Sequence, residues 1–107
     1  MDFMLFISTA GSQAEGERIA KALVRSKLAA CINVIPGAVS FFSWEGKICR
    51  EKETLLLIKS RKGVLKKIIN KIKEMNSYSV PEGIYIKVDG GEKNYLDWVR
   101  KSMKAQK

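Results

Sequence analysis

Five side chains spread along this chain carry chemistry that a ligand site could use. They are Cys31, Trp44, Glu53, Lys59 and Tyr78. A thiol ligates soft metal ions, a carboxylate and an ammonium hold polar or charged ligands, a phenol donates a hydrogen bond, and an indole forms an apolar wall. We predict that these five residues form one binding pocket, in which Glu53, Lys59 and Tyr78 anchor the ligand and Trp44 is a wall.

Each of the five also has a structural interpretation. A free cysteine inside an apolar strand, such as Cys31, is more often a small core residue. Glu53 and Lys59 lie six residues apart, and this even spacing puts both on one face of a strand, where an ion pair could instead fix the alignment of subunits. Trp44 can anchor a hairpin and Tyr78 can cap a sheet. The sequence leaves both interpretations open.

Histidine, the residue that acid–base catalysis uses most often, is missing from this chain. The chain also contains no nucleophile-elbow motif and no phosphate loop of the Walker type. Cys31 and Cys49 are its two thiols, so one chain cannot complete a tetrahedral zinc shell from cysteine and histidine. We therefore expect a binding protein and not an enzyme.

Length and composition predict one domain over residues 1–107. The chain is 46% hydrophobic, which is enough for one packed core, and its formal charge of +9 would attract phosphates, nucleic acid or anionic membranes without selecting among them. The apolar run at 3–7 follows no basic leader and is far shorter than the roughly 20 residues that span a bilayer. We expect a cytoplasmic protein with reduced thiols that does not enter a membrane.

Local signals mark where the helices and strands begin and end. Ser12 and Glu15 have the spacing of a capping box at a helix start. Pro36-Gly37 predicts a turn that ends the strand at 29–35, and Glu45-Gly46-Lys47 predicts a hairpin tip within the β-rich stretch 39–58. The other predicted elements are strands at 3–9 and 84–88 and helices at 12–26, 64–75 and 93–103.

This order predicts an α+β, ferredoxin-like fold, βαββαβ with an added C-terminal helix, in which the helices cover one face of an antiparallel sheet. The run Leu55–Ile58 has no polar residue to alternate with, so we expect both of its faces to be covered. The last helix carries an apolar stripe that includes Trp98, and we expect it to dock through that residue.

Several short stretches together resemble the CutA family of divalent-cation tolerance proteins. They run in the family's order and spacing over nearly the whole chain. The stretches are Lys27–Asn33, Ile35–Ala38, Ser43–Ile48, Glu51–Glu53, Ile58–Ser60, Tyr78–Pro81 and Tyr95–Trp98. The resemblance implies a homotrimer with PII-like architecture, in which a long hairpin reaches neighbouring subunits and the five candidate residues line an intersubunit cleft. Pairing with another subunit would also protect the apolar stretch at 39–44 from aggregation.

The resemblance also implies a role in tolerance of copper and other divalent cations. Family members with a proposed copper site carry a cysteine in the first strand and histidines before a proline-tyrosine pair. The matching positions here are Ser8, Met75 and Asn76, with Ser77 where the proline usually stands. Serine and amide are poorer ligands than thiolate and imidazole for Cu(II), whereas methionine suits Cu(I). The metal ligands are therefore not assigned from the sequence.

A basic RNA- or anion-binding module is the alternative function. The same βαββαβ order occurs in RNA-recognition domains, and the helix predicted after Gly63 is rich in lysine. Those domains stack bases on aromatic residues of a basic, glycine-containing third strand, and the stretch 39–44 lacks the lysine and glycines of that motif. We therefore expect self-association and a metal ion or small anion as partners, and do not expect nucleic acid.

Overall fold

A computed structural model describes residues 2–104 of the chain, so residues 1 and 105–107 of the predicted domain lie outside the described part. Its elements follow the predicted order. They are β1 (Phe3–Ala10), α1 (Gln13–Arg25), β2 (Cys31–Trp44), β3 (Lys47–Arg61), a 3₁₀ turn η1 (Lys62–Val64), α2 (Leu65–Met75), β4 (Ile84–Lys87) and α3 (Lys93–Ser102). The prediction of βαββαβ with a further helix is confirmed.

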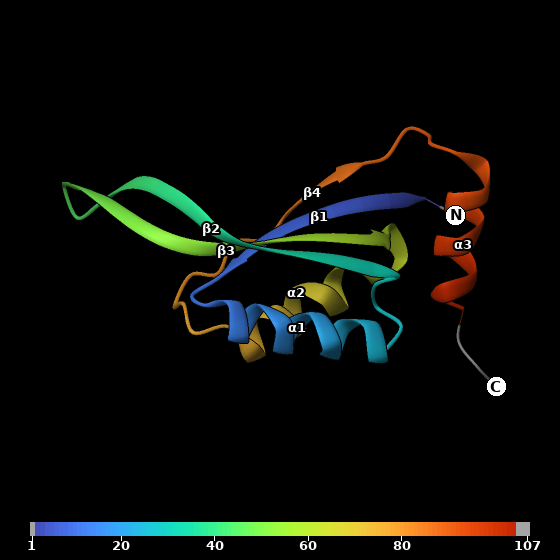
Figure 1. The fold of residues 1–107 in the computed structure, drawn as a ribbon, viewed down its shortest axis with the longest axis horizontal. Coiled ribbons are helices and arrows are strands. Elements are labelled where there is room, and N and C mark those ends of the chain that lie inside the picture. The colour runs from blue at the N-terminus through green and yellow to red at the C-terminus, as the bar shows by residue number, and fades with distance from the viewer. Residues whose placement is uncertain (1, 105–107) are drawn as a thin grey trace.

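The four strands form one antiparallel sheet in the order β2-β3-β1-β4. Helices α1 and α2 lie side by side under one face of this sheet, and the distal half of the β2–β3 pair projects beyond the other strands as a free ribbon (Figure 1). This arrangement is the ferredoxin-like α+β fold that the element order predicted.

The predicted turn at Pro36-Gly37 is wrong. Strand β2 runs through this pair without reversing, and its register against β3 shifts between Ile35 and Ala38. Gly37 has φ +83°, a conformation that glycine adopts without strain, so the pair forms a β-bulge within one long strand. The chain reverses instead at Glu45 and Gly46, whose φ values of 51° and 78° confirm the predicted hairpin tip.

The core lies between the sheet and the two helices. Alternate residues of β1 and β3 point into it, among them Phe6, Leu56 and Ile58, each with no exposed surface. Apolar residues recur on α1 and α2 at helical spacing and meet this face of the sheet. The fully or almost fully buried ones are Ile19, Leu23, Ile68 and Ile72.

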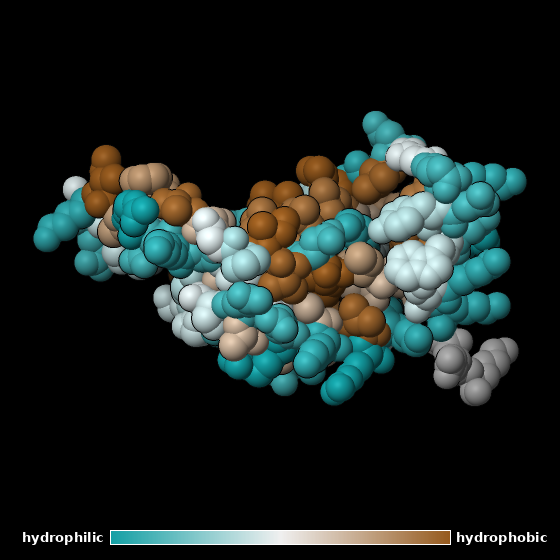
Figure 2. Space-filling view, viewed as in Figure 1, coloured by the Kyte–Doolittle hydropathy of each residue, from teal (hydrophilic) through white to brown (hydrophobic). Residues whose placement is uncertain are grey.

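Within one chain the opposite face of the sheet is largely uncovered, so the expected cover over the second face of Leu55–Ile58 stays a prediction. Leu56 and Ile58 are buried, but Leu55 and Leu57 on the other side are only half-buried within one chain. Strand register aligns them with apolar neighbours, and we call this surface the open face. It consists of Leu5, Ile7, Ile35, Leu55, Leu57, Ile84 and Ile86. Hydrophobic surface extends across the middle of the molecule in Figure 2.

The sequence predicted that helix α3 docks through Trp98, and this prediction is wrong. The Trp98 side chain is 48% exposed and contacts the Tyr95 ring, with 5.7 Å between the ring centroids. Val99 and Met103 hold the helix instead, since each is 2% exposed and part of the core. Trp98 and Tyr95 thereby add aromatic surface to the uncovered side of the molecule.

Replacing Ile58 by alanine should lower the free energy of unfolding by about 2 to 5 kcal/mol, because the lost side chain leaves a cavity between the sheet and the helices. Ile48 is the matched control, since it lies on the same strand and is 82% exposed, so its replacement should cost less than about 0.5 kcal/mol. Urea unfolding at equal protein concentration measures both. Equal losses would contradict the assigned core.

Candidate functional site

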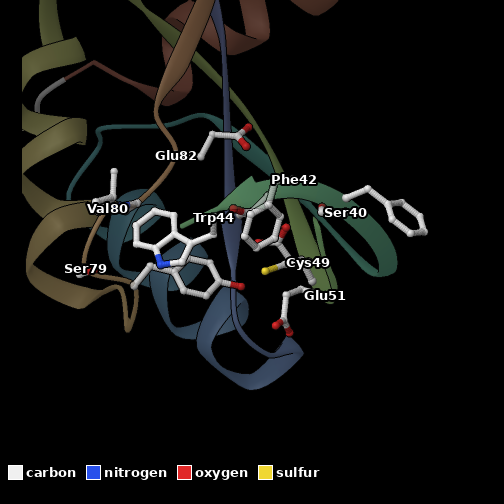
Figure 3. Close-up of a pocket in the computed structure, with 13 residues that line it drawn as sticks. Ser40, Phe42, Trp44, Cys49, Glu51, Ser79, Val80 and Glu82 are labelled. Atoms are coloured by element: carbon white, nitrogen blue, oxygen red, sulfur yellow. The ribbon is translucent and has the colours of Figure 1, made fainter. Parts of the chain in front are cut away.

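A groove of about 910 Å³ lies where the free ribbon meets the loop between α2 and β4. Figure 3 shows side chains from the two sides of this hollow, with Phe42, Trp44, Cys49 and Glu51 on the ribbon and Ser79, Val80 and Glu82 on the loop. Glu53 and Tyr78 also line it. We call it the acid groove because of these three carboxylates.

The acid groove exists because β3 is longer than the strand beside it. β1 ends at Ala10, opposite Thr54, whereas β2 and β3 continue to the hairpin tip. The chain that leaves α2 crosses the end of β1 before it enters β4, so the loop faces the base of the ribbon. The two sides of the groove thus come from segments that lie far apart in the sequence.

Two hydrogen bonds fix the loop to the end of β1, and a third holds the loop itself. The Ser8 hydroxyl donates to the Glu82 carbonyl oxygen over 2.8 Å. The Asn76 side-chain amide donates to the Thr9 carbonyl oxygen over 2.9 Å, and its oxygen accepts from the Tyr78 backbone N–H over 2.9 Å. Together they set the positions from which Tyr78 and Glu82 enter the groove.

The start of α1 supports the same loop. The Glu15 backbone N–H donates to the Ser12 hydroxyl over 3.1 Å, and the Glu15 carboxylate accepts from the Gly11 backbone N–H over 3.0 Å. The predicted capping box is therefore present, with its second bond reaching one residue further than the usual form. Burial alone would raise the pKa of Glu15, but hydrogen bonds from Gly11 and Ser77 outweigh it and lower this pKa.

The groove concentrates negative charge in a strongly positive chain. Its lining contains Glu51, Glu53 and Glu82 and no lysine or arginine from the described residues. Burial raises the pKa of Glu82, and the charge of Glu53 adds to this shift. Burial also raises the pKa of Tyr78, with further contributions from its hydrogen bond to Glu53 and from nearby carboxylates. The site thus favours a bound positive charge.

The five residues predicted to form one pocket fall into two groups within a chain. Trp44, Glu53 and Tyr78 line the acid groove. Cys31 and Lys59 are register partners near the other end of the sheet. Strand alternation puts Glu53 and Lys59 on the same face, but six strand residues separate them by about 20 Å. One small ligand cannot contact both groups in a single chain.

Lys59 and Cys31 have neighbours of their own on the open face. The Lys59 ammonium donates to the side-chain oxygen of Asn33, one pleat along β2 from Cys31. Tyr95 on α3 lies against Cys31: burial raises the pKa of Tyr95, and its interaction with the Cys31 side chain, including a hydrogen bond, adds to the shift. This end of the open face therefore presents a cation beside aromatic surface.

Sequence reasoning missed two of the groove's carboxylates. Glu51 could have been found, because it stands two residues before Glu53 and strand alternation puts both on one face. Glu82 gave no signal, since its place depends on how the loop crosses the end of β1.

The positions that the family resemblance links to copper do not fit a metal in this chain. Ser8 is fully buried and its hydroxyl is engaged with Glu82. Asn76 uses both ends of its amide in the bonds to Thr9 and Tyr78, and Met75 packs against the core. Over residues 2–104 no cluster of three cysteine, aspartate or glutamate side chains has metal-binding geometry. Here these positions anchor the loop.

Ionisation of Tyr78 should make the protein less stable in alkaline solution. Because folding raises its pKa above the ordinary value of 10.0, the Tyr78 contribution to stability is complete below pH 10 and is lost as the pH rises further. The difference in unfolding free energy between wild type and Tyr78→Phe should therefore be constant up to about pH 9 and then shift in favour of the variant. Urea unfolding from pH 8 to 11 measures it, and parallel curves throughout would contradict it.

Comparisons by sequence and by structure both identify the family that the sequence resembles. The sequence profile of the CutA1 divalent ion tolerance protein family matches residues 4–102. The divalent-cation tolerance protein CutA of Thermus thermophilus is 37% identical over 94 residues, which is 88% of this chain and 91% of that protein. The chloroplastic CutA protein of Arabidopsis thaliana is also 37% identical over 94 residues, but the chain spans only 52% of its length.

Solved structures of the same family superimpose closely on this fold. The CutA1 structure from Oryza sativa has a TM-score of 0.94 at 34% identity, covering 99% of this chain and 97% of that one. CutA from Xylella fastidiosa has a TM-score of 0.93 at 35% identity, covering 97% of this chain and 100% of that one. The chain therefore belongs to the CutA1 divalent ion tolerance protein family.

Proposed function

We propose that the protein is a non-enzymatic, PII-like homotrimer that acts in divalent-cation tolerance by binding a cation or small polar ligand in clefts between its subunits. The observation that carries this proposal is the open face. One of its ends carries a cation and the other lies beside the acid groove, and only a second copy brings these ends together.

The open face is suited to burial against another protein surface. Ile84 and Ile86 are 56% and 54% exposed on the short edge strand β4, and Ile35 is 41% exposed on β2. Register places them in rows with the half-buried leucines and isoleucine of β1 and β3. Burying such apolar surface is worth about 25 cal/mol per Å², which favours association over exposure to water.

Charge at the ends of this face selects how copies pack. Lys59 lies at one end, with Arg61 one pleat further along β3, while Glu53 lies at the other end beside Glu51 and Glu82. A head-to-tail contact sets the cationic end of one copy on the acidic end of the next, and such a heterologous interface forms a ring when the rotation between copies closes. The family resemblance supports three copies in this ring.

The same packing reunites the five candidate residues. Cys31 and Lys59 of one copy would meet Trp44, Glu53 and Tyr78 of its neighbour, in a cleft to which the groove contributes three carboxylates and the neighbour's Lys59 one ammonium. The cleft would keep a negative charge, which favours a cation or a polar ligand with a positive group. The copper-linked positions Ser8, Met75 and Asn76 play no part in it, because their polar atoms are already engaged.

We place this activity in the cytoplasm. Cys31 and Cys49 are both free thiols, which suits a reducing compartment, although relatives are named for the chloroplast and, in one structure, the periplasm. Among the described residues, no helix is long and apolar enough to span a bilayer.

Reversing the charges of Lys59 and Glu53 tests the proposed contact between copies. Light scattering should give three times the 12.0 kDa chain mass for wild type. Lys59→Glu and Glu53→Lys should each weaken association by about 100-fold or more, because each leaves a charge facing its like in a buried interface. The double variant Lys59→Glu/Glu53→Lys should recover most of the loss, since the pair is restored with exchanged signs.

The matched control reverses two charges on the outer surface of α1. Glu17→Lys and Lys21→Glu change the net charge by the same amounts and lie on the opposite side of the sheet, so both should leave the trimer intact. A wild-type monomer in dilute solution would refute the trimer. A double variant with additive losses would instead refute the pairing of Lys59 with Glu53.

Calorimetry with Cu(II), Cu(I) and Zn(II) tests the ligand of the cleft. At least one of these ions should bind the trimer, and Glu51→Gln should weaken that binding about 10-fold or more by removing one carboxylate. Glu17→Gln is the control, since it also removes one carboxylate but lies on the exposed surface of α1, outside the groove. The proposal fails for these ions if the wild-type trimer gives no heat with any of them.

A further inference from the structure

The surface of the helix layer, opposite the open face, carries a dense group of positive charges that the proposed function does not use. The end of α1 and the start of α2 meet there. The Ser60 hydroxyl, just before η1, donates to the Leu28 carbonyl oxygen just after α1 over 2.6 Å. Cations of both helices thus gather at one end of the layer, which we call the basic end. Its members are Lys21, Arg25, Lys27, Lys62, Lys66 and Lys67.

These six cations have no ion-pair partner within residues 2–104. The ion pairs of that part of the chain are Lys71 with Glu74 at 3.9 Å and Arg100 with Asp97 at 2.7 Å, both outside the basic end. Two carboxylates lie nearby without such a pair: Glu17, one helical turn before Lys21, and Asp2, which shares a shallow hollow with Arg61 and Lys62. Five of the six cations are exposed and Lys27 is half-buried, so a partner could reach them.

The placement of Lys66 and Lys67 costs helix stability. They stand in the first turn of α2, where the helix dipole is positive and acidic residues are favoured, and this turn contains no acidic residue. The residue before the helix, Val64, offers no side-chain cap to the first backbone N–H groups. An anion bound beside this turn would relieve the charge repulsion between these lysines and the helix dipole.

The surroundings of the basic end favour one class of polyanion. No aromatic residue belongs to it, so it cannot stack bases as single-strand binders do. Val24, 41% exposed, is the single large exposed apolar side chain of the described parts of α1 and α2, which is too little apolar surface for insertion into a membrane. A surface of lysine and arginine with little apolar area suits the closely spaced phosphates of a nucleic-acid backbone.

We propose that the basic end binds the phosphate backbone of nucleic acid without reading its sequence. This proposal does not depend on the trimer or on the cleft ligand. It departs from the expectation that nucleic acid is not a partner, because the fold brings the lysines at the start of α2 to the cations at the end of α1.

Fluorescence anisotropy with a labelled duplex DNA of mixed sequence tests this proposal on the full chain. Lys62→Glu/Lys66→Glu/Lys67→Glu should weaken binding at low salt by about 10-fold or more and reduce the slope of log K against log salt by about 3. This triple change should not unfold the protein, because glutamates at the start of α2 complement its dipole. Circular dichroism verifies the fold.

The matched control is Lys93→Glu/Lys101→Glu/Lys104→Glu, on and just after α3, which changes the net charge by the same amount at another site. It should weaken binding less than about 3-fold. Equal losses in the two triple variants would show that only net charge matters and would overturn the basic end. A preference of more than about 10-fold between two unrelated duplexes would overturn binding without sequence readout.

Vesicles containing phosphatidylserine form the second arm of the experiment. The proposal expects duplex DNA to bind and the first triple variant to lose that binding. If wild type binds the vesicles but not the duplex at low salt, a membrane is the partner and the proposal is overturned. If it binds neither, the basic end is a solvated surface and the proposal is overturned as well.

Discussion

The structure depends on one imbalance: two helices cover one face of a four-stranded sheet, and almost nothing covers the other. The hydrophobic effect acts equally on both faces, because burying a given area of apolar surface gives the same gain in free energy on either face. On the covered face the gain is realised within the chain, through residues such as Phe6, Leu56 and Ile58. On the open face it is available only to an assembly.

The long ribbon is a consequence of the unequal strand lengths in this fold. β2 and β3 have 14 and 15 residues, whereas β1 has 8 and β4 has 4, so the hairpin extends where no neighbouring strand can pair with it. The bulge at Gly37 lets β2 keep its pairing through a proline that would otherwise interrupt it. A groove forms at the base of the ribbon because the loop after α2 is bonded to the end of β1 at that level.

Charge divides the molecule into regions with different roles. The acid groove has carboxylates and no lining cation among the described residues, although the chain as a whole has a net charge of +9. The helix layer has the reverse balance at its basic end. In the proposed ring, the unlike ends of the open face attract each other, and the helix layers, which carry like charge, face outward.

Local patterns in the sequence determined much of the fold: the capping box at Ser12, the hairpin tip at Gly46 and the helical stripe of α2 each depend on neighbours a few residues away. Their order was enough for the ferredoxin-like topology. Tertiary structure alone decided that Pro36-Gly37 bends a strand without ending it, because pairing with β3 continues on both sides of it. It also decided that α3 docks through Val99 and not Trp98, and that Glu82 joins the groove, because these depend on contacts between segments distant in sequence. The five candidate residues illustrate the limit: alternation along a strand predicted which face Glu53 and Lys59 share, but only the fold revealed that about 20 Å of strand separates them.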